Sequence, residues 1–333
     1  MILITGANGY IGSHFLIEVI NRGLEYIAID NFSRSNPDTL TQVEKITNNR
    51  INFVEGDIAN EKITNKLFSD FKIDSVVHFA GFKSLVESIE NPLNYYINNL
   101  SKTITLIQQM EKHNIHNIIF SSSATVYGGE LKSPIHEDNK LGFPFSSYAQ
   151  SKLFIEQVLK KMTQVKSQWN VGVLRYFNPI GCHHSGLIGE NNNEKASNLI
   201  PAIINVILKL QPYLEIYGKD FNTRDGTGVR DYLHVEDLVE GHVRALDYIK
   251  KNGGFNVWNL GSGKGYSVLE IINAFEKELK YQIPITYKPR RQGDVGEYWA
   301  DVRKANKDLA WVAAKDMQLI VKDILRYSET LNK

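Results

Sequence analysis

The chain has 333 residues, of which 42% are hydrophobic, and a formal net charge of +1. A chain of this length and composition can bury a large core in one large domain or in two. A net charge so close to zero gives no electrostatic reason to expect nucleic acid or an anionic membrane as a partner.

Residues 2–5 form a short apolar run that we expect to be a core strand, which leaves no room for a signal peptide. The longest apolar stretch, residues 199–210, is too short to span a bilayer and contains Asn205 and Lys209. Cys182 is the single cysteine, so an internal disulfide is excluded. These features predict a cytoplasmic protein without a membrane partner.

A glycine-rich turn follows the first strand directly, with Gly6, Gly9 and Gly12 in the spacing Gly-x-x-Gly-x-x-Gly. Gly6 permits a tight turn, Gly9 lets the backbone approach a pyrophosphate, and Gly12 lets a helix pack closely on the strand. An amphipathic helix is expected next, over Ser13 to Arg22. Its N-terminus offers unpaired N–H groups to an anion. Strand, glycine turn and helix in this order predict dinucleotide binding.

A second strand is expected over residues 25–29, and Asp30 follows it. An acidic residue at this place can bind the adenine ribose hydroxyls and repel a 2′-phosphate. Asp30 therefore predicts NAD rather than NADP as the cofactor, although Arg34 nearby is a mild signal in the other direction.

Strands and helices go on alternating through the first half of the chain. Further strands are expected at residues 51–55, 75–81, 117–120 and 171–176, and helices at residues 61–71, 92–113 and 146–161. This alternation predicts an α/β fold with a doubly wound parallel Rossmann sheet. Ligands bind such sheets outside the carboxyl ends of the strands. Residues expected at those ends are Asp30, Asp57, Ala80, Gly81 and Ser123.

Tyr148 and Lys152 lie four residues apart on the expected helix 146–161, so their side chains share one face. A free tyrosine has a pKa of about 10 and is a poor base at neutral pH. A nearby ammonium group lowers that pKa. We therefore expect Lys152 to lower the pKa of Tyr148, which becomes an acid/base for a sugar or alcohol hydroxyl.

The second half of the chain is less regular. We expect a turn at residues 178–181, a polar loop at 189–198, a helix from Leu199, and a turn-rich segment at 225–232. The predicted domains are a cofactor-binding domain at 1–177 and a smaller C-terminal α/β substrate domain at 178–333. A helix at 235–248 and a strand at 257–260 are expected to return to the first domain, within a segment at 235–262.

The cluster Cys182-His183-His184 is not expected to bind zinc. Adjacent side chains should diverge, and no fourth ligand lies at a suitable spacing. We therefore expect no metal site in this chain.

Several longer runs carry a family resemblance. They are residues 5–12, 78–81, 121–128 (Ser-Ser-Ser-Ala-Thr-Val-Tyr-Gly), 175–179 (Arg-Tyr-Phe-Asn-Pro), 228–235 (Gly-Val-Arg-Asp-Tyr-Leu-His-Val) and 298–301 (Tyr-Trp-Ala-Asp). In these runs, which span nearly the whole chain, the sequence resembles the extended short-chain dehydrogenase/reductase superfamily. Within it, the sequence is similar to the UDP-glucose 4-epimerase family.

The resemblance implies an activity in galactose metabolism, the interconversion of UDP-glucose and UDP-galactose on tightly held NAD. By resemblance, Tyr148 takes the proton of the sugar C4 hydroxyl while C4 passes a hydride to the nicotinamide. Lys152 bridges the nicotinamide ribose, and Ser123 binds the same hydroxyl as Tyr148. The transient 4-keto sugar then turns over and receives the hydride on its other face.

The resemblance also implies the remaining site residues. Those expected to contact NAD are Gly6, Gly9, Tyr10, Ile11, Gly12, Asp30, Asn31, Asp57, Ile58, Phe79, Ala80, Gly81, Lys83, Asn98, Ser121, Ser123, Tyr148, Lys152 and Phe177. Those expected to contact the UDP-sugar are Ser123, Tyr148, Asn178, Asn198, Leu199, Ile216, Tyr217, Arg230, Arg291, Asp294 and Tyr298. Arg230 and Arg291 are expected to pair with the two phosphates.

Tyr298 bears on the choice of sugar. In the family a bulky ring at the matching position crowds the C2 substituent of the hexose. The resemblance therefore implies that N-acetylated UDP-sugars are poor substrates.

Other NAD-dependent nucleotide-sugar enzymes remain alternatives, namely a 4,6-dehydratase, a decarboxylase or a reductase. A dehydratase needs an extra Asp and Glu after a threonine, whereas here Val126 follows Thr125. A reductase that exchanges NADP at every turnover conflicts with Asp30. A binding module without catalysis is the third reading, but such proteins tend to lose the tyrosine or the lysine.

The resemblance finally implies a homodimer, in which helices 92–113 and 146–161 of two subunits pair as a four-helix bundle. Its seam would use Leu100, Ile104, Ile107, Leu153, Phe154 and Val158, which could equally pack inward.

Overall fold

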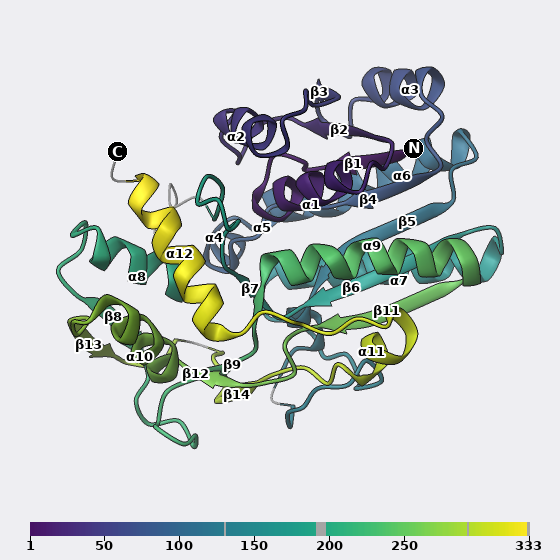
Figure 1. Cartoon of the computed structure of the whole chain (residues 1–333). Coiled ribbons are helices and arrows are strands. Elements are labelled where there is room, and N and C mark those ends of the chain that lie inside the picture. Colours follow the sequence, from purple (N-terminus) through teal and green to yellow (C-terminus); the bar gives the residue numbers. More distant parts are fainter. Residues whose placement is uncertain (130, 191–197, 292, 332–333) are drawn as a thin grey trace.

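The computed structural model describes residues 1–129, 131–190, 198–291 and 293–331 of the chain. Its central layer is a seven-stranded sheet in the order β11-β6-β5-β4-β1-β2-β3, and every neighbouring pair is parallel (Figure 1). The strands are β1 Ile2–Thr5, β2 Tyr26–Asp30, β3 Phe53–Glu55, β4 Ser75–His78, β5 Asn117–Ser123, β6 Asn170–Tyr176 and β11 Phe255–Leu260. The predicted doubly wound parallel sheet is confirmed.

The chain builds this sheet outward from β1 in two directions. β1 pairs with β2 up to Thr5↔Ile29, and on its other side with β4 up to Thr5↔His78. Gly6 and Phe79 therefore follow their strands, and Asp30 ends its strand, at the same edge of the sheet. The crevice where the strand order reverses is the place at which open parallel sheets bind their ligands.

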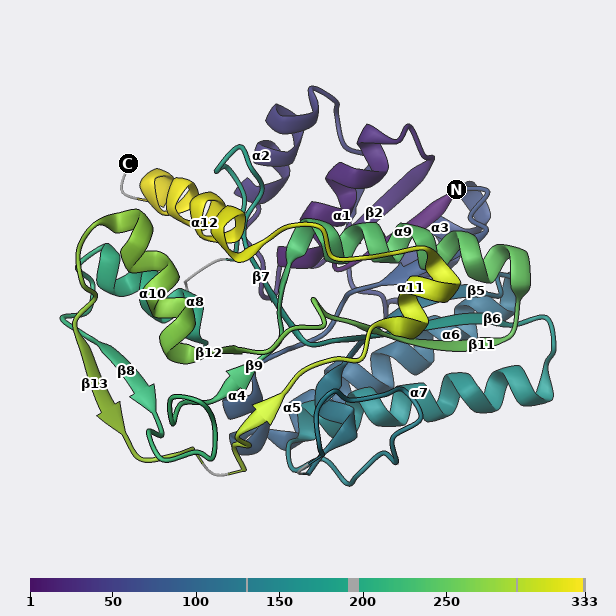
Figure 2. The same ribbon diagram turned by 60° about the horizontal axis from the view of Figure 1, so that its bottom comes forward.

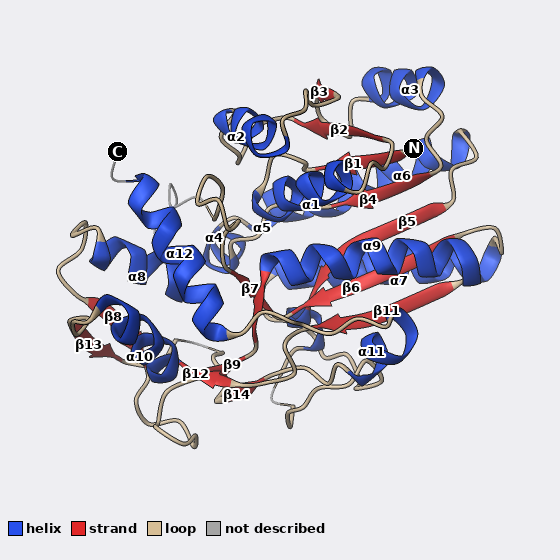
Figure 3. Cartoon of the chain, in the orientation of Figure 1, coloured by secondary structure: helices blue, strands red, loops and turns tan. Residues whose placement is uncertain are grey.

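Helices cover both faces of the sheet (Figure 3). One face carries α1 (Tyr10–Asn21), α2 (Asp38–Thr47) and α9 (Val235–Asn252), and the other carries α3 (Glu61–Asp70), α6 (Lys102–Lys112) and α7 (Ser147–Val165). Successive strand residues point to opposite faces. Accordingly Ile4 packs with α1 and α9, and its neighbour Leu3 packs with α6 and α7.

The helix expected at 92–113 is present but irregular. α4 (Leu85–Glu90) precedes it, and it consists of α5 (Pro92–Tyr95), a π-helical segment η1 (Tyr96–Ser101) and α6. π-Helical turns often occur at functional sites. Here the segment carries Asn98 and the buried Asn99, whose amide bonds both backbone groups of Phe82 at 2.8 and 3.0 Å. Asn99 thus fixes the chain directly after β4.

The C-terminal part forms smaller sheets beside the main one (Figure 2). They pair β7 (Asn178–Ile180) with β10 (Tyr232–His234), β8 (Leu214–Tyr217) with β13 (Ile285–Lys288), and β9 (Val229–Arg230) with β12 (Tyr266–Ser267) and β14 (Glu297–Tyr298). Helices α8 (Leu199–Ile207), α10 (Val268–Leu279) and α12 (Met317–Leu331) surround a separate apolar core in this part. A short helix α11 (Arg303–Leu309) packs on α9 and β11.

The turn predicted at 178–181 is wrong for most of its length, because Asn178–Ile180 forms strand β7. Its partner, Tyr232–His234, lies more than 50 residues later in the chain. The local Asn-Pro signal favours a turn, and a strand held by so distant a partner leaves no local signal. Of the loop predicted at 189–198, residues 191–197 lie outside the described residues.

Residues 255–260 return to the main sheet as its edge strand. β11 pairs with β6 from Phe255↔Val171 to Leu260↔Tyr176, and α9 packs on the same sheet. The domain limits at residues 177 and 178 remain a prediction. None of the helices in the described ranges is both long and apolar enough to cross a membrane.

Candidate active site

The glycine turn forms a close approach between β1 and α1. Gly6 has a φ of +67°, which favours glycine, and a Cβ on Gly12 would lie 2.1 Å from the Gly6 carbonyl oxygen. Gly9 caps α1 without a side-chain hydrogen bond to the first turn. The N–H groups of this turn are therefore open to an anion at the helix N-terminus.

Asp30 is held beside this turn by its own hydrogen bonds. Its carboxylate accepts the backbone N–H groups of Asn8 at 3.0 Å and Phe32 at 2.9 Å, and the Ser35 hydroxyl at 3.0 Å. A carboxylate fixed at the end of β2 is placed to accept ribose hydroxyls.

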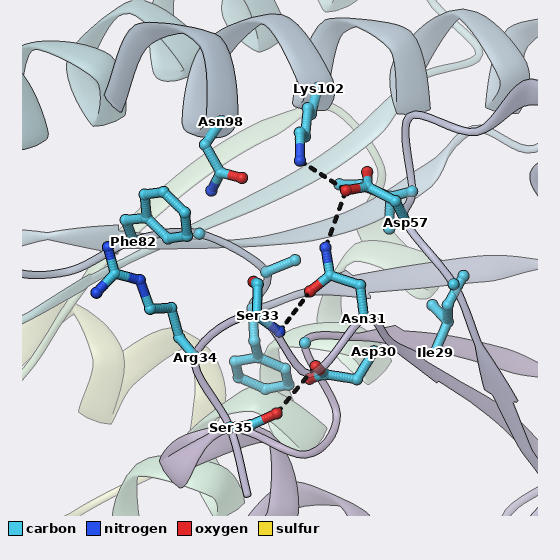
Figure 4. A pocket seen from close by; sticks show the side chains of 17 residues that line it. Ile29, Asp30, Asn31, Ser33, Arg34, Ser35, Asp57, Phe82, Asn98 and Lys102 are labelled. Carbon is cyan, nitrogen blue, oxygen red and sulfur yellow. Dashed lines mark hydrogen bonds and ion pairs between the residues drawn. The ribbon is translucent and has the colours of Figure 1, made fainter. Parts of the chain in front are cut away.

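Asp57 follows strand β3 and links the end of this strand to helix α6 (Figure 4). Its carboxylate accepts Asn31 Nδ2 at 2.9 Å and pairs with Lys102 Nζ at 2.6 Å. Burial raises the pKa of the Asp57 carboxyl, but the hydrogen bond from Lys102 and that from the Ala59 N–H outweigh burial, and the pKa is lowered. The carboxylate is thus ionised at neutral pH.

These residues line one pocket, which Figure 4 shows. Of the residues expected to contact NAD, it contains Gly6, Gly9, Asp30, Asn31, Asp57, Ile58, Phe79, Ala80, Gly81 and Asn98. It also contains residues that the sequence analysis missed, namely Ile29, Ser33, Arg34, Ser35, Gly56, Phe82 and Lys102. Lys102 follows Asn98 by four residues, and this helical spacing could have revealed it. Arg34 pairs with Glu87 and lies 4.6 Å from the centre of the Phe82 ring.

The predicted catalytic side chains come together at the other end of this crevice. Ser123 ends β5, and Tyr148 and Lys152 lie on the first turns of α7. The Ser123 side chain lies beside the Tyr148 hydroxyl and favours its ionised form. Lys152 is buried and donates to the Ser121 carbonyl at 2.7 Å. A Cβ on Gly81, which lines the pocket, would lie 3.7 Å from Lys152 Nζ, so the pocket leads to the catalytic group.

The charge state of this group differs from the expectation. Burial raises the pKa of Tyr148, and the hydrogen bond with Ser123 opposes the rise. Burial also lowers the pKa of Lys152 to about 8. The expectation that Lys152 lowers the pKa of Tyr148 is therefore wrong for the chain alone. Lys152 Nζ is directed to the Ser121 carbonyl and lies 6.0 Å from the centre of the Tyr148 ring.

A buried ion pair positions α7 on the sheet. Arg175 of β6 contacts Glu156 of α7 at 2.7 Å, and both side chains are only 4% exposed. The Ser122 hydroxyl donates to the same carboxylate. Glu156 lies one helical turn after Lys152, so this pair sets the rotation of α7 that brings Tyr148 and Lys152 to Ser123. The sequence analysis missed Glu156, whose spacing from Lys152 was a signal.

Tyr10 and Lys83 lie over the N-terminus of α1 with partners of their own. The Tyr10 hydroxyl donates to the Gly181 carbonyl at 2.6 Å, and Lys83 pairs with Glu190 at 2.6 Å. Both partners come from the chain after β7, so they tie that segment to the start of α1 and to the chain after β4. Ile11 lies on α1 beside Tyr10.

Tyr298 connects the catalytic group with the smaller sheets. Its hydroxyl donates to the Ala124 carbonyl at 2.8 Å, directly after Ser123, and its ring lies 5.8 Å from that of the buried Phe177. Ala124 begins the short 3-10 helix η2 (Ala124–Tyr127). In β14, Tyr298 is the register partner of Arg230 in β9.

Four of the other residues expected to contact the UDP-sugar form two pairs. Arg230 pairs with Asp294, and the Arg291 guanidinium lies 4.0 Å from the centre of the Tyr217 ring. Asn178 begins β7, and Asn198 and Leu199 begin α8.

Ile216 differs from its expected place. Its side chain is 1% exposed in the core under α8, α10 and α12. A ligand can therefore reach only the backbone of this residue.

The side chains of His183 and His184 do not point apart. The expectation that adjacent side chains diverge, which was one reason to exclude a metal site, is therefore wrong here. Their ring centres are 4.1 Å apart. Adjacent side chains point apart in a regular strand, whereas these residues lie in the irregular segment after β7.

The comparisons with known proteins agree with this geometry. The model of the NAD dependent epimerase/dehydratase family matches residues 2–261. The chain is 43% identical to a UDP-glucose 4-epimerase from Bacillus subtilis over 329 residues, which cover 99% of this chain and 97% of the relative.

Two solved structures are similar over nearly their whole length. One is UDP-glucose 4-epimerase from Stenotrophomonas maltophila with bound NAD and formylated UDP-arabinopyranose, with a TM-score of 0.96, 37% identity, and coverage of 99% of this chain and 98% of that one. The other is the Bifidobacterium longum enzyme in complex with NAD⁺ and UDP, with a TM-score of 0.94, 43% identity and 99% coverage of both chains.

Proposed function

Because this chain belongs to the NAD dependent epimerase/dehydratase family, we propose that it is a UDP-glucose 4-epimerase. It interconverts UDP-glucose and UDP-galactose by inverting C4 through a transient 4-keto sugar. One observation supports this function above all others: Ser123, Tyr148 and Lys152 adjoin the pocket formed by the glycine turn and Asp30.

The residues present fit NAD. Gly6 and Gly9 line the pocket without side chains, Gly12 lets α1 pack against the Gly6 backbone, and the Asp30 carboxylate stands at the ribose end of the same pocket. Asn31, Asp57 and Asn98 complete this end, and Lys152 marks the nicotinamide end. Bound NAD supplies the acceptor and donor of the hydride and, when oxidised, a positive charge beside the sugar.

The side chains of this chain then move the proton of the C4 hydroxyl. Tyr148 receives it as a phenolate, whose oxygen lies beside Ser123, and becomes a neutral phenol. Because burial raises the pKa of Tyr148, the phenol needs a positive charge nearby to act as a base at neutral pH. Lys152, held by the Ser121 carbonyl, orients the ribose and supplies part of that charge.

The UDP group is held by the smaller sheets, away from the carbon that reacts. Arg230 and Arg291 present guanidinium groups that suit phosphate oxygens, while Tyr217 and Asp294 supply a ring and a carboxylate for the nucleoside. The starts of β7 and α8 face the same crevice if this function is right, and they carry Asn178, Asn198 and Leu199. Firm contacts to UDP and few contacts to the hexose let the keto sugar rotate.

The test is incubation of the purified enzyme with UDP-galactose in the absence of added cofactor, followed by sugar analysis. UDP-glucose is expected to accumulate until the two sugars reach equilibrium. If conversion requires added NADP, or if a 6-deoxy or decarboxylated sugar forms, the epimerase function is wrong.

We also propose that the enzyme is a homodimer, but with a different seam from the one predicted. Ile107 and Leu153 are buried in the chain itself, so they pack inward. Large apolar side chains are exposed instead on α5 and η1, within the predicted helix 92–113, and on the segment before α7: Leu93 at 71%, Ile97 at 57%, Phe143 at 82% and Phe145 at 66%. Gln150 joins these segments through Tyr96 and the Pro144 carbonyl.

Contiguous exposed apolar surface of this kind is typical of an interface between proteins. A mass of twice 37.9 kDa by light scattering is expected, and a mass equal to that of one chain would contradict the dimer.

A cytoplasmic location is proposed from Cys182, which is a buried free cysteine.

A further inference from the structure

A second cluster of ligand-type side chains lies outside the nucleotide pocket, between α1, the segment after β7 and the first turn of α9. It contains His183, His184 and Glu236, and a cavity beside it is also lined by His14 and Lys315. None of these side chains takes part in the proposed reaction.

The three groups already face one another. His183 Nε2 lies 3.9 Å and His184 Nδ1 lies 3.6 Å from the same oxygen of Glu236, Oε1. One potential ligand atom from each of the three residues lies within 4.8 Å of the others. A tetrahedral zinc ion with bonds of about 2.0–2.1 Å needs its ligand atoms roughly 3.4 Å apart. The His184 side chain is 71% exposed, so it can make this small shift freely.

Neighbouring groups orient these potential ligands. Lys315 Nζ holds the other oxygen of Glu236, Oε2, at 2.8 Å, which leaves Oε1 facing the two imidazoles. His183 Nδ1 accepts the backbone N–H of Ser185 at 3.2 Å, so the neutral ring carries its proton on Nε2; an ion bound at Nε2 moves that proton to Nδ1, where Ser185 Oγ at 2.8 Å can accept it. Metal-binding histidines are usually oriented by such a partner on the second ring nitrogen.

His14 gives an independent sign of a ligand at this place. Its Nδ1 bonds the Tyr10 carbonyl at 2.7 Å and must donate to it, so Nε2 carries the lone pair of the neutral ring. His14 is 2% exposed, and its Nε2 has no hydrogen-bond partner among the described residues. The ring lies 6.5 Å from that of His183 and lines the same cavity. A buried nitrogen left without a partner is costly.

We propose that His183, His184 and Glu236 bind a divalent transition-metal ion. His14 lies behind them, and its Nε2 lone pair is available as a further ligand to the ion. Two imidazoles and one carboxylate suit Zn²⁺ and Co²⁺ rather than Mg²⁺ or Ca²⁺, which prefer oxygen ligands. The site joins the segment after β7 to α9. That segment also contacts Tyr10 at the start of α1 through Gly181, and Lys83 after β4 through Glu190. A bound ion therefore holds in place the chain that lies over the N-terminus of α1.

The test uses the untagged full-length protein after dialysis against a chelator. Zn²⁺ binding is measured by calorimetry, and Co²⁺ binding by its visible absorption, which intensifies when the ion leaves octahedral water for a site of lower coordination. We expect one equivalent of each ion to bind with saturation. Zn²⁺ should also raise the unfolding temperature, because it binds only the folded arrangement.

Four variants separate this site from other histidines. His184→Ala and Glu236→Gln should each weaken Zn²⁺ binding by more than about tenfold, since even residues around a metal site contribute that much. His136→Ala removes an imidazole that is 46% exposed elsewhere and should change nothing. Lys315→Met removes a cation next to the ion and should tighten binding. Unfolding temperatures measured in chelator show that each variant is folded.

The proposal is overturned if the wild type binds no saturating equivalent of Zn²⁺. It is also overturned if His184→Ala and Glu236→Gln bind Zn²⁺ as tightly as His136→Ala does. Neither result depends on the epimerase activity, so the metal site and the proposed function fail or stand separately.

Discussion

The nucleotide pocket and the sugar side of the crevice are held together in different ways. In the pocket, Asp30 bonds Phe32 and Ser35, two and five residues away. On the sugar side, Tyr298 bonds Ala124 across 174 residues, and Arg230 bonds Asp294 across 64 residues. Hydrogen bonds between side chains that line the pocket span at most 45 residues, as between Asp57 and Lys102, whereas the sugar side depends on the docking of separate sheets.

This difference suits the two tasks. A cofactor that stays bound through many turnovers needs a preformed site. A sugar that must rotate between two hydride transfers needs firm contacts at UDP and room at the hexose. The following predictions test this division, from the largest expected effect to the smallest.

Tyr148→Phe tests the point at which the two regions meet. Removal of the hydroxyl should lower kcat by roughly 10²–10⁴-fold, because the proton of the C4 hydroxyl loses its acceptor. The purified variant should keep its NAD, which absorbance of the released cofactor after denaturation can measure. Near-normal kcat would exclude Tyr148 as the acid/base.

Arg175→Met tests the scaffold under the pocket. It leaves the Glu156 carboxylate buried without its cation, and such a loss costs about 3–5 kcal/mol of unfolding free energy. Denaturant unfolding measures this loss. The matched change on the sugar side, Arg230→Met, breaks a pair whose side chains are 20% and 28% exposed, and its cost should be clearly smaller. Equal costs would remove the contrast between the two regions.

Arg230→Ala tests the UDP anchor. A hydrogen bond to a charged group contributes about 1.5–3 kcal/mol, so KM for UDP-galactose should rise roughly tenfold or more. The content of bound NAD should stay that of the wild type. A fall in bound NAD with an unchanged KM would place Arg230 on the cofactor instead.

Tyr298→Ser tests the choice of sugar. The ring that bonds Ala124 beside the catalytic serine is expected to crowd a C2 substituent. Its removal should raise kcat/KM for UDP-N-acetylglucosamine relative to UDP-glucose by roughly tenfold, as a volume change in a pocket does. A wild type that turns over both sugars equally well would contradict the assignment. Tyr217→Ser, which removes a ring at the UDP end, is the control and should leave that ratio unchanged.

The pH dependence of stability gives the smallest effect. Burial lowers the pKa of Lys152 from 10.5 in the unfolded chain to about 8 in the folded one. Between these values the unfolded state binds more protons, so the stability contributed by Lys152 should rise with pH from about 8 to 10.5. Lys152→Met should remove this rise, as comparison of unfolding curves at pH 8 and 10 would show. An identical rise in the variant would assign it to other groups.

The sequence predicted the pocket better than the sugar side, because the pocket residues lie at the ends of strands that the sequence reveals. Gly6, Asp57 and Gly81 each follow a strand and Asp30 ends one, and the parallel pairing of these strands with β1 or β2 brings them together. The side chain of Ile216 packs in the core beside α8 and α10, and the short strand β8 shows no local sign of which face does so. The contact of Ile216 with the UDP-sugar stays a prediction.

By itself, the sequence determined the parallel sheet, the glycine turn, and the shared face of Tyr148 and Lys152. Each of these depends on residues that are close in the chain or on regular alternation. Only the tertiary structure decided the strand at 178–180, the pairing of Arg230 with Asp294, the burial that raises the pKa of Tyr148, and the meeting of His183 and His184 with Glu236. Contacts across 50 or more residues, and the loss of water around a side chain, arise only when the elements pack.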